Sequence, residues 1–166
     1  MLHACAIADL GTGRTIALVG PSGAGKTTAA GSLCERFAYV TDETVGITGE
    51  LAVVPYPKPL SLKSSGDPFK QQVSPDELGY ATVDAQMRLH AVLLLDRTAG
   101  QTMAVLDPVN ALEGLANVAS ETSYLARLDR PLHRLAQALT QGRGLQRIRY
   151  GEASQLPGVV TEMFQQ

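Results

Sequence analysis

A glycine-rich stretch near the N-terminus carries the clearest chemistry in this sequence. Residues 20–27 read GPSGAGKT, a full match to the phosphate-binding pattern G-x-x-x-x-G-K-[ST] (a P-loop). In such a loop the backbone N–H groups converge on a polyphosphate, the lysine reaches its β and γ oxygens, and the final hydroxyl binds Mg²⁺. The pattern predicts an ATP or GTP site. The phosphate contacts are expected from Gly20, Ser22, Gly23, Ala24, Gly25, Lys26, Thr27 and Thr28.

Acidic residues that could serve phosphoryl transfer occur in two places. Transfer to a hydroxyl needs an acid to hold Mg²⁺ and a carboxylate to orient the acceptor and take its proton. Asp42 and Glu43 follow the predicted strand after the P-loop helix, whereas Asp96 ends the apolar run AVLLLD. Adjacent carboxylates point to opposite sides of an extended chain unless the backbone kinks. Spacing alone leaves both alternatives open.

The elements that must position these residues alternate between short apolar runs and helical patterns. Strands are predicted at 3–8, 15–20, 38–47 (ending in or interrupted by the two acids), 51–55, 90–96, 102–107 and, edge-like, 145–150. Helices are predicted at about 26–37, 107–119, 120–128 and 131–140, with a helical tail broken at 157–158. Alternation of this kind favours an α/β fold, a mixed and mainly parallel sheet flanked by helices.

Length and composition favour one domain over residues 1–166. The chain is 45% hydrophobic and 18% charged, which is ordinary for a compact α/β domain. Five prolines between Pro55 and Pro75 interrupt the pattern. Ladder strands and helices do not tolerate that density, so an ordered loop or lid is predicted at about 55–79.

Charge and hydropathy exclude several partners. The net charge is −2 and no dense block of Lys and Arg occurs, so nucleic-acid binding is not expected. The apolar runs are too short to span a bilayer, and the first residues do not resemble a secretory signal. Cys5 and Cys34 form no metal-binding pattern, and we expect free buried thiols in a cytoplasmic protein.

Four motifs, in order, resemble the HPr kinase/phosphorylase family and its looser relatives. They are LHACAIA with His3, GPSGAGKTT, the acid pair in YVTDE, and PYPKPLSLK. Together they span Leu2 to about Lys63, well over a third of the chain. Proteins of this family share the nucleotide-binding core of phosphoenolpyruvate carboxykinase and transfer phosphate from ATP to a serine hydroxyl. The resemblance therefore implies that fold and an ATP- and Mg²⁺-dependent kinase.

The resemblance also implies roles for individual residues. Lys26 matches the phosphate lysine and Thr27 the Mg²⁺ hydroxyl. Asp42 and Glu43 match the family's paired acids, one for the metal and one as base, and His3 matches a histidine near the γ-phosphate. The implied catalytic residues are Asp42, Glu43, Lys26 and His3, and the implied metal ligands are Thr27, Asp42 and Glu43.

The sequence departs from the family at three points. The family has two aspartates where this chain has Asp42 and Glu43. The Arg-Gly-Leu-Gly-type signature of HPr kinases has no counterpart, and neither does the N-terminal regulatory domain. These departures favour an acceptor other than HPr.

The leading hypothesis is a kinase acting on a hydroxyl, with serine of a peptide, protein or small molecule as the expected acceptor. In it, Asp42 orients and deprotonates the acceptor. A P-loop ATPase or nucleotide switch, with Asp96 as the essential acid, is the first alternative. A non-catalytic ATP-binding partner protein is the second. A homo-oligomer through the C-terminal helix is also considered.

Several other side chains could serve the site but have plainer roles open to them. Lys58 and Lys63 could close over phosphates, and Tyr56 and Tyr80 could line a pocket, but solvated and packing roles are favoured for them. An arginine group around Pro131 could clamp a transferring phosphate, and Arg130 is its best functional candidate. Surface roles are favoured, since Arg127 and Arg134 could equally pair with Glu121 or Asp129. His90 and His133 are expected to be structural.

Overall fold

The computed structural model describes residues 1–63 and 70–165. Its centre is formed by three parallel strands, β2 (Arg14–Val19), β8 (Arg88–Arg97) and β10 (Gly144–Tyr150). The side chains of β2 after Arg14 are buried, as an apolar strand covered on both faces requires. In the ladder, Val19 lies opposite Leu94, so β2 and β8 end at the same edge of the sheet.

Antiparallel strands extend this centre on both sides. On one side β1 (Leu2–Ala8) pairs with β2, and on its other edge β1 pairs with β3 (Ala38–Thr41) and then with β4 (Thr44–Ile47). The order β5-β4-β1-β2-β8-β10-β9 results, with β5 at Val53–Val54 and β9 at Val105–Pro108. Among the described strands only the β2–β8 and β8–β10 pairings are parallel. The sheet is mixed, and the expected parallel majority is wrong.

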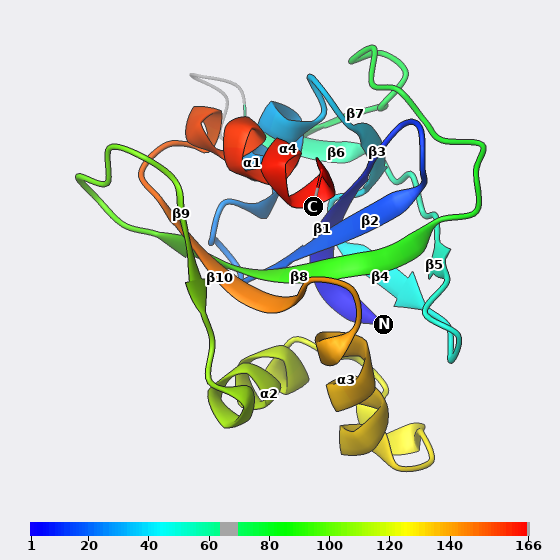
Figure 1. Ribbon diagram of the computed structural model, residues 1–166. Coiled ribbons are helices and arrows are strands. Elements are labelled where there is room, and N and C mark those ends of the chain that lie inside the picture. Colours follow the sequence, from blue (N-terminus) through cyan, green and yellow to red (C-terminus); the bar gives the residue numbers. More distant parts are fainter. Residues whose placement is uncertain (64–69, 166) are drawn as a thin grey trace.

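Helices cover the two faces of the sheet in separate pairs (Figure 1). On one face α1 (Lys26–Leu33) and α4 (Leu156–Gln165) pack over a core that includes Ile16, Leu18 and Leu93. The other face carries α2 (Ala111–Ser120) and α3 (Pro131–Thr140), which pack over Ala17, Val19 and Leu94. Alternate residues of one strand therefore enter different cores, as the period of two requires.

The proline-rich segment contains strands, contrary to the expectation of a loop throughout 55–79. Within it, β6 (Leu60–Lys63) and β7 (Lys70–Val73) form an antiparallel two-stranded sheet, and Leu60 is fully buried against the α1 face. The prolines at 55, 57, 59 and 75 flank this pair of strands rather than interrupt it. The part of the expected lid at 64–69 lies outside the described residues.

Four further features of the elements differ from the sequence-based expectation. The first helix ends at Leu33 rather than near Phe37, and α2 begins at Ala111 behind an Asn110 N-cap, leaving Pro108 in β9. Only a short 3-10 helix, η1 (Leu125–Arg127), forms within 120–128. The strand β10 is interior because β9 pairs with its outer edge.

The C-terminal segment forms a second 3-10 turn, η2 (Ala153–Gln155), which leads directly into α4. Pro157 occupies the first turn of α4, where a missing N–H is tolerated, so the predicted break does not occur. Among the helices of the described residues, none has the length and apolar character that crossing a bilayer would require.

Candidate phosphoryl-transfer site

The P-loop connects the end of β2 to the first residue of α1. Gly23 and Gly25 adopt φ angles of 85° and 88°, in the left-handed region that side-chain-bearing residues rarely adopt. The N–H of Ala24 donates to the carbonyl of Pro21 (3.1 Å), and that of Ala29 to the carbonyl of Gly25 (2.9 Å). The loop is thus a compact turn in front of the positive end of a helix, an arrangement suited to an anion.

Lys26 lies folded back against this loop. Lys26 is only 8% exposed, and its Nζ donates hydrogen bonds to the carbonyls of Gly20 (2.5 Å) and Pro21 (3.1 Å). Burial lowers the pKa of the ammonium, an effect that the negative charge of Glu121 opposes. The cation is therefore held at the mouth of the loop.

The chain bends at Asp42 and Glu43, between β3 and β4, and the two carboxylates diverge there. Asp42 is 7% exposed, and its Oδ2 accepts a hydrogen bond from the Thr27 hydroxyl (3.4 Å). Its Oδ1 is buried, and in the described part of the chain it has no hydrogen-bond partner. A buried carboxylate oxygen left in this state is costly unless a ligand completes it.

Glu43 points toward the proline-rich segment instead. Its Oε2 forms an ion pair with Nζ of Lys58, whose own carbonyl accepts a hydrogen bond from the Tyr39 hydroxyl (2.8 Å). The three predicted metal ligands are thus divided, because Thr27 and Asp42 contact each other while Glu43 is engaged by Lys58. No group of three or more His, Cys, Asp or Glu side chains among the described residues could form a metal site. A hydroxyl and one carboxylate nevertheless suit Mg²⁺, which takes few protein ligands and shares phosphate oxygens.

His3 lies on β1 beside the acid pair. It is opposite Thr44 in the ladder, and the next residue, Ala4, donates its N–H to the carbonyl of Glu43 (3.1 Å). By strand alternation His3 faces the same side of the sheet as Cys5 and Ile7, which pack in the core beneath α1. The structure therefore brings Lys26, Thr27, Asp42 and His3 to one edge and face of the sheet.

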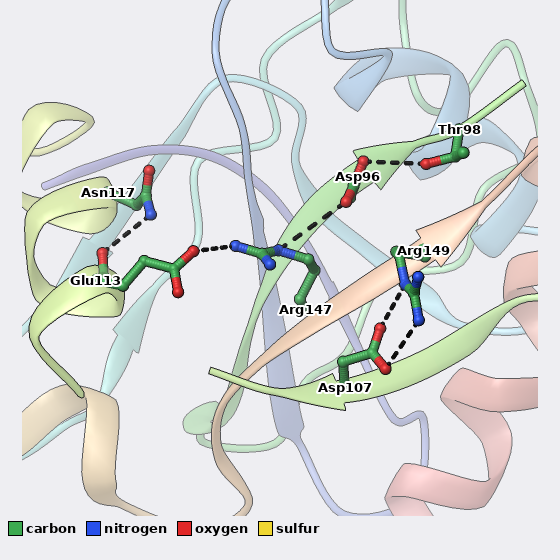
Figure 2. Close-up of polar contacts among 7 residues, drawn as sticks. All are labelled: Asp96, Thr98, Asp107, Glu113, Asn117, Arg147 and Arg149. Carbon is green, nitrogen blue, oxygen red and sulfur yellow. Dashed lines mark hydrogen bonds and ion pairs between the residues drawn. The ribbon is translucent and has the colours of Figure 1, made fainter. Parts of the chain in front are cut away.

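Asp96 belongs to a different group of charges. Figure 2 shows its carboxylate between Thr98, which donates to Oδ1 (3.2 Å), and Arg147, whose Nε lies 4.0 Å from Oδ2. Arg147 also pairs with Glu113 of α2, so this network is on the face of the sheet opposite α1. Asp96 thus lies near the end of β8, a strand beside the P-loop, but its side chain points away from Thr27.

The arginines considered as phosphate clamps are exposed. Arg127 lies over the ring of Tyr124 at 5.1 Å, and the Nε of Arg134 donates to the backbone carbonyl of Asp129 (3.0 Å). Arg130 adopts a left-handed backbone conformation (φ 49°) before α3. In the described structure none of the three forms an ion pair with Glu121 or Asp129.

The remaining candidates have mostly packing roles. Tyr80 packs against Tyr39, with ring centroids 6.0 Å apart, whereas Tyr56 is exposed. The ring of His90 stacks on Phe164 and its Nε2 lies 3.1 Å from the carbonyl of Met163, which supports the structural role expected for it. His133 is exposed on α3. The side chain of Lys63 lies outside the described residues.

Glu121, which the sequence suggests only as a surface partner of arginines, lies near the site. The carbonyl of Glu121 accepts the N–H of His3 (2.7 Å), and its charge is the carboxylate charge that raises the pKa of Lys26. No local pattern marks it, since it follows the end of α2 and is brought near Lys26 only by the pairing of distant segments.

Comparisons with known proteins give one kind of match. No protein-family model and no curated protein matches the chain. Among solved structures, the HPr(Ser) kinase/phosphatase from Coxiella burnetii is similar over 98% of this chain and 92% of that one, with a TM-score of 0.50 and 16% identity. The chain therefore has a mixed α/β fold similar to that of an HPr kinase, and at this identity the likeness concerns the fold alone.

Proposed function

We propose that the chain is an ATP- and Mg²⁺-dependent phosphotransferase that moves the γ-phosphate to a hydroxyl, with serine of a peptide, protein or small molecule as the expected acceptor. The similar fold of an HPr(Ser) kinase/phosphatase supports a nucleotide-binding kinase in general terms. The contact between the Thr27 hydroxyl and Asp42, next to a P-loop, is the observation that carries the proposal. It joins a metal-binding hydroxyl to a buried acid where the terminal phosphate would lie.

In the proposed site the P-loop amides and Lys26 bind the phosphates of ATP. The Thr27 hydroxyl and Asp42 Oδ2 would hold Mg²⁺, which when bound with the nucleotide neutralises charge on the phosphate oxygens. These residues fit the ion because both offer hard oxygen atoms that already converge. Lys26 would give up its hydrogen bonds to the carbonyls of Gly20 and Pro21 and bind phosphate oxygens instead. These carbonyls therefore hold the ammonium group close to where the phosphates would bind.

Asp42 Oδ1 is the atom that we assign to the acceptor. This buried oxygen can accept the hydrogen bond of the incoming hydroxyl and take its proton as the hydroxyl oxygen bonds to the γ-phosphorus and ADP leaves. Glu43, paired with Lys58, would fix the neighbouring segment rather than act as the base. His3 would lie near the γ-phosphate. A homo-oligomer and a cytoplasmic location stay predictions.

Labelled phosphate transfer tests the proposal. The protein is incubated with Mg²⁺, γ-labelled ATP and cell extract or serine-containing peptides, and the labelled product is identified. The variant Asp42→Asn should bind ATP but lose transfer, whereas Asp96→Asn, which removes an acid on the opposite face, should retain it.

Three outcomes would contradict the proposal. ATP turnover that needs no acceptor and depends on Asp96 would identify an ATPase or switch. Tight ATP binding with no product in any extract would identify a non-catalytic partner protein. Normal transfer by Asp42→Asn would show that the wrong acid was assigned.

A further inference from the structure

The segment after α2 continues the position of β2 in the sheet. The ladder between β1 and β2 ends with Ala4 opposite Val19, where the chain turns into the P-loop. One residue further along β1, the N–H of His3 donates to the carbonyl of Glu121 (2.7 Å), and Leu2 bridges Thr122 in antiparallel fashion. Because Ala4 donates toward Glu43 on the β4 side, His3 donates toward the β2 side. Glu121 therefore lies directly beyond the end of β2.

This position brings Glu121 close to Lys26. Gly20 follows Val19 directly, where β2 ends, and its carbonyl accepts a hydrogen bond from the Nζ of Lys26 (2.5 Å). Residue 121 therefore lies beside the part of the P-loop that holds the ammonium group. The proximity has an electrostatic effect, because the charge of Glu121 raises the pKa of Lys26 against the lowering by burial.

Glu121 differs from the two neighbouring acids in its partners. Asp42 accepts a hydrogen bond from Thr27, and Glu43 is neutralised by Lys58. Within the described residues the carboxylate of Glu121 forms neither an ion pair nor a side-chain hydrogen bond, and the residue is partly buried. Its negative charge therefore acts on Lys26 without a closer cation to cancel it.

We propose that Glu121 is a third acidic residue of the phosphate site and that it favours metal-bound over metal-free nucleotide. This inference rests on the nucleotide binding proposed above. ATP carries about four negative charges at neutral pH, and its Mg²⁺ complex about two. A carboxylate whose charge acts on the phosphate lysine repels each form roughly in proportion to its charge, so it penalises the free nucleotide more. Glu121 is thus a specificity-determining residue.

Calorimetric titration with ATP tests this, once in excess Mg²⁺ and once in EDTA. The variant Glu121→Gln removes the charge and keeps the main-chain contact with His3, which uses the carbonyl of residue 121. We expect it to bind metal-free ATP about three- to tenfold more tightly and Mg²⁺-bound ATP about two- to threefold more tightly. Glu113→Gln is the matched control, because it removes the same charge on the opposite face, and it should change neither affinity.

A conservative variant guards against an effect of misfolding. Glu121→Asp keeps the charge, and it should keep most of the preference for the metal-bound form. The inference is overturned if Glu121→Gln binds metal-free ATP no more tightly than the parent, or if both affinities rise by the same factor. A parent protein that binds neither form of ATP would instead refute the proposed function, so the two failures are distinguishable.

Discussion

Glu43 and Lys58 form an ion pair that joins the acid pair to the proline-rich segment before β6. The two side chains are about half and one-third exposed, so the pair contributes little to stability, under about 1 kcal/mol. Its main effect is electrostatic, because it neutralises a carboxylate next to Asp42 in the chain, near the proposed phosphate site.

Lys58→Gln should therefore weaken ATP binding several-fold while changing the free energy of unfolding by less than about 1 kcal/mol. The substitution leaves the Glu43 carboxylate without its cation beside the site. The double variant Lys58→Gln/Glu43→Gln should recover the lost affinity, as measured by ATP titration and urea unfolding. A double variant that binds as weakly as Lys58→Gln would show that Lys58 contacts the nucleotide directly.

Asp42→Asn should stabilise the nucleotide-free protein by about 1 kcal/mol. A buried carboxylate whose Oδ1 lacks a partner is a cost to the fold that an uncharged amide reduces. Thermal unfolding without Mg²⁺ measures the change, and a rise in Tm of several degrees is expected. A lower Tm in this variant would mean that the bond from Thr27 to Asp42 outweighs the desolvation of the charge.

The two cysteines should be unreactive in the folded protein. Cys5 and Cys34 are buried, and burial raises the pKa of both thiols, that of Cys34 to about 12. A thiol reagent at pH 8 should modify neither in the native state and both in denaturant. Rapid native labelling of either would contradict the buried placement.

The same thiols make stability fall at high pH. The folded protein holds the Cys34 proton more tightly than the unfolded chain, whose thiol has the ordinary cysteine pKa of about 9.0. This contribution is fully present below pH 9 and is lost as the pH rises toward 12. Urea unfolding over that range should show a declining free energy, less steep in Cys34→Ala.

Phe164 of α4 is expected to be important for the stability of the α1 face. Its ring lies 5.2 Å from that of Phe37 and stacks on His90, and it is 8% exposed. Phe164→Ala should cost about 3–5 kcal/mol in urea unfolding because it leaves a cavity. Leu112→Ala is the control, since Leu112 is 79% exposed on α2 and should change stability by less than about 0.5 kcal/mol. Similar losses in the two variants would contradict this packing.

Local patterns predicted the part of the fold that surrounds the P-loop. The strands before and after it, and the start of α1 at Lys26, lie where the apolar runs and glycines placed them. The proline count misled at 55–79, because those prolines that the structure describes flank β6 and β7, where no ladder N–H is required of them.

Pairings between distant segments could not be predicted in the same way. The alternation of apolar and polar residues in β10 is typical of an edge strand. In the fold, however, β9 pairs with the outer edge of β10, and no local pattern predicts that pairing. The local run AVLLLD likewise suggests a metal-binding acid at Asp96, whereas the fold places Arg147 beside its carboxylate. The sequence suggests only a surface role for Glu121, because it is the pairing with β1 that brings this residue near Lys26.

The placement of Glu121 beyond β2 bears on how the molecule assembles during synthesis. The P-loop leaves the ribosome early, but β8, which pairs with β2, and Glu121, which lies beyond the end of β2, are translated much later. Contacts so remote along the chain must form before the proposed nucleotide site is complete, which slows folding. A nascent polypeptide halted before residue 121 should therefore be unable to bind ATP, however complete its glycine loop.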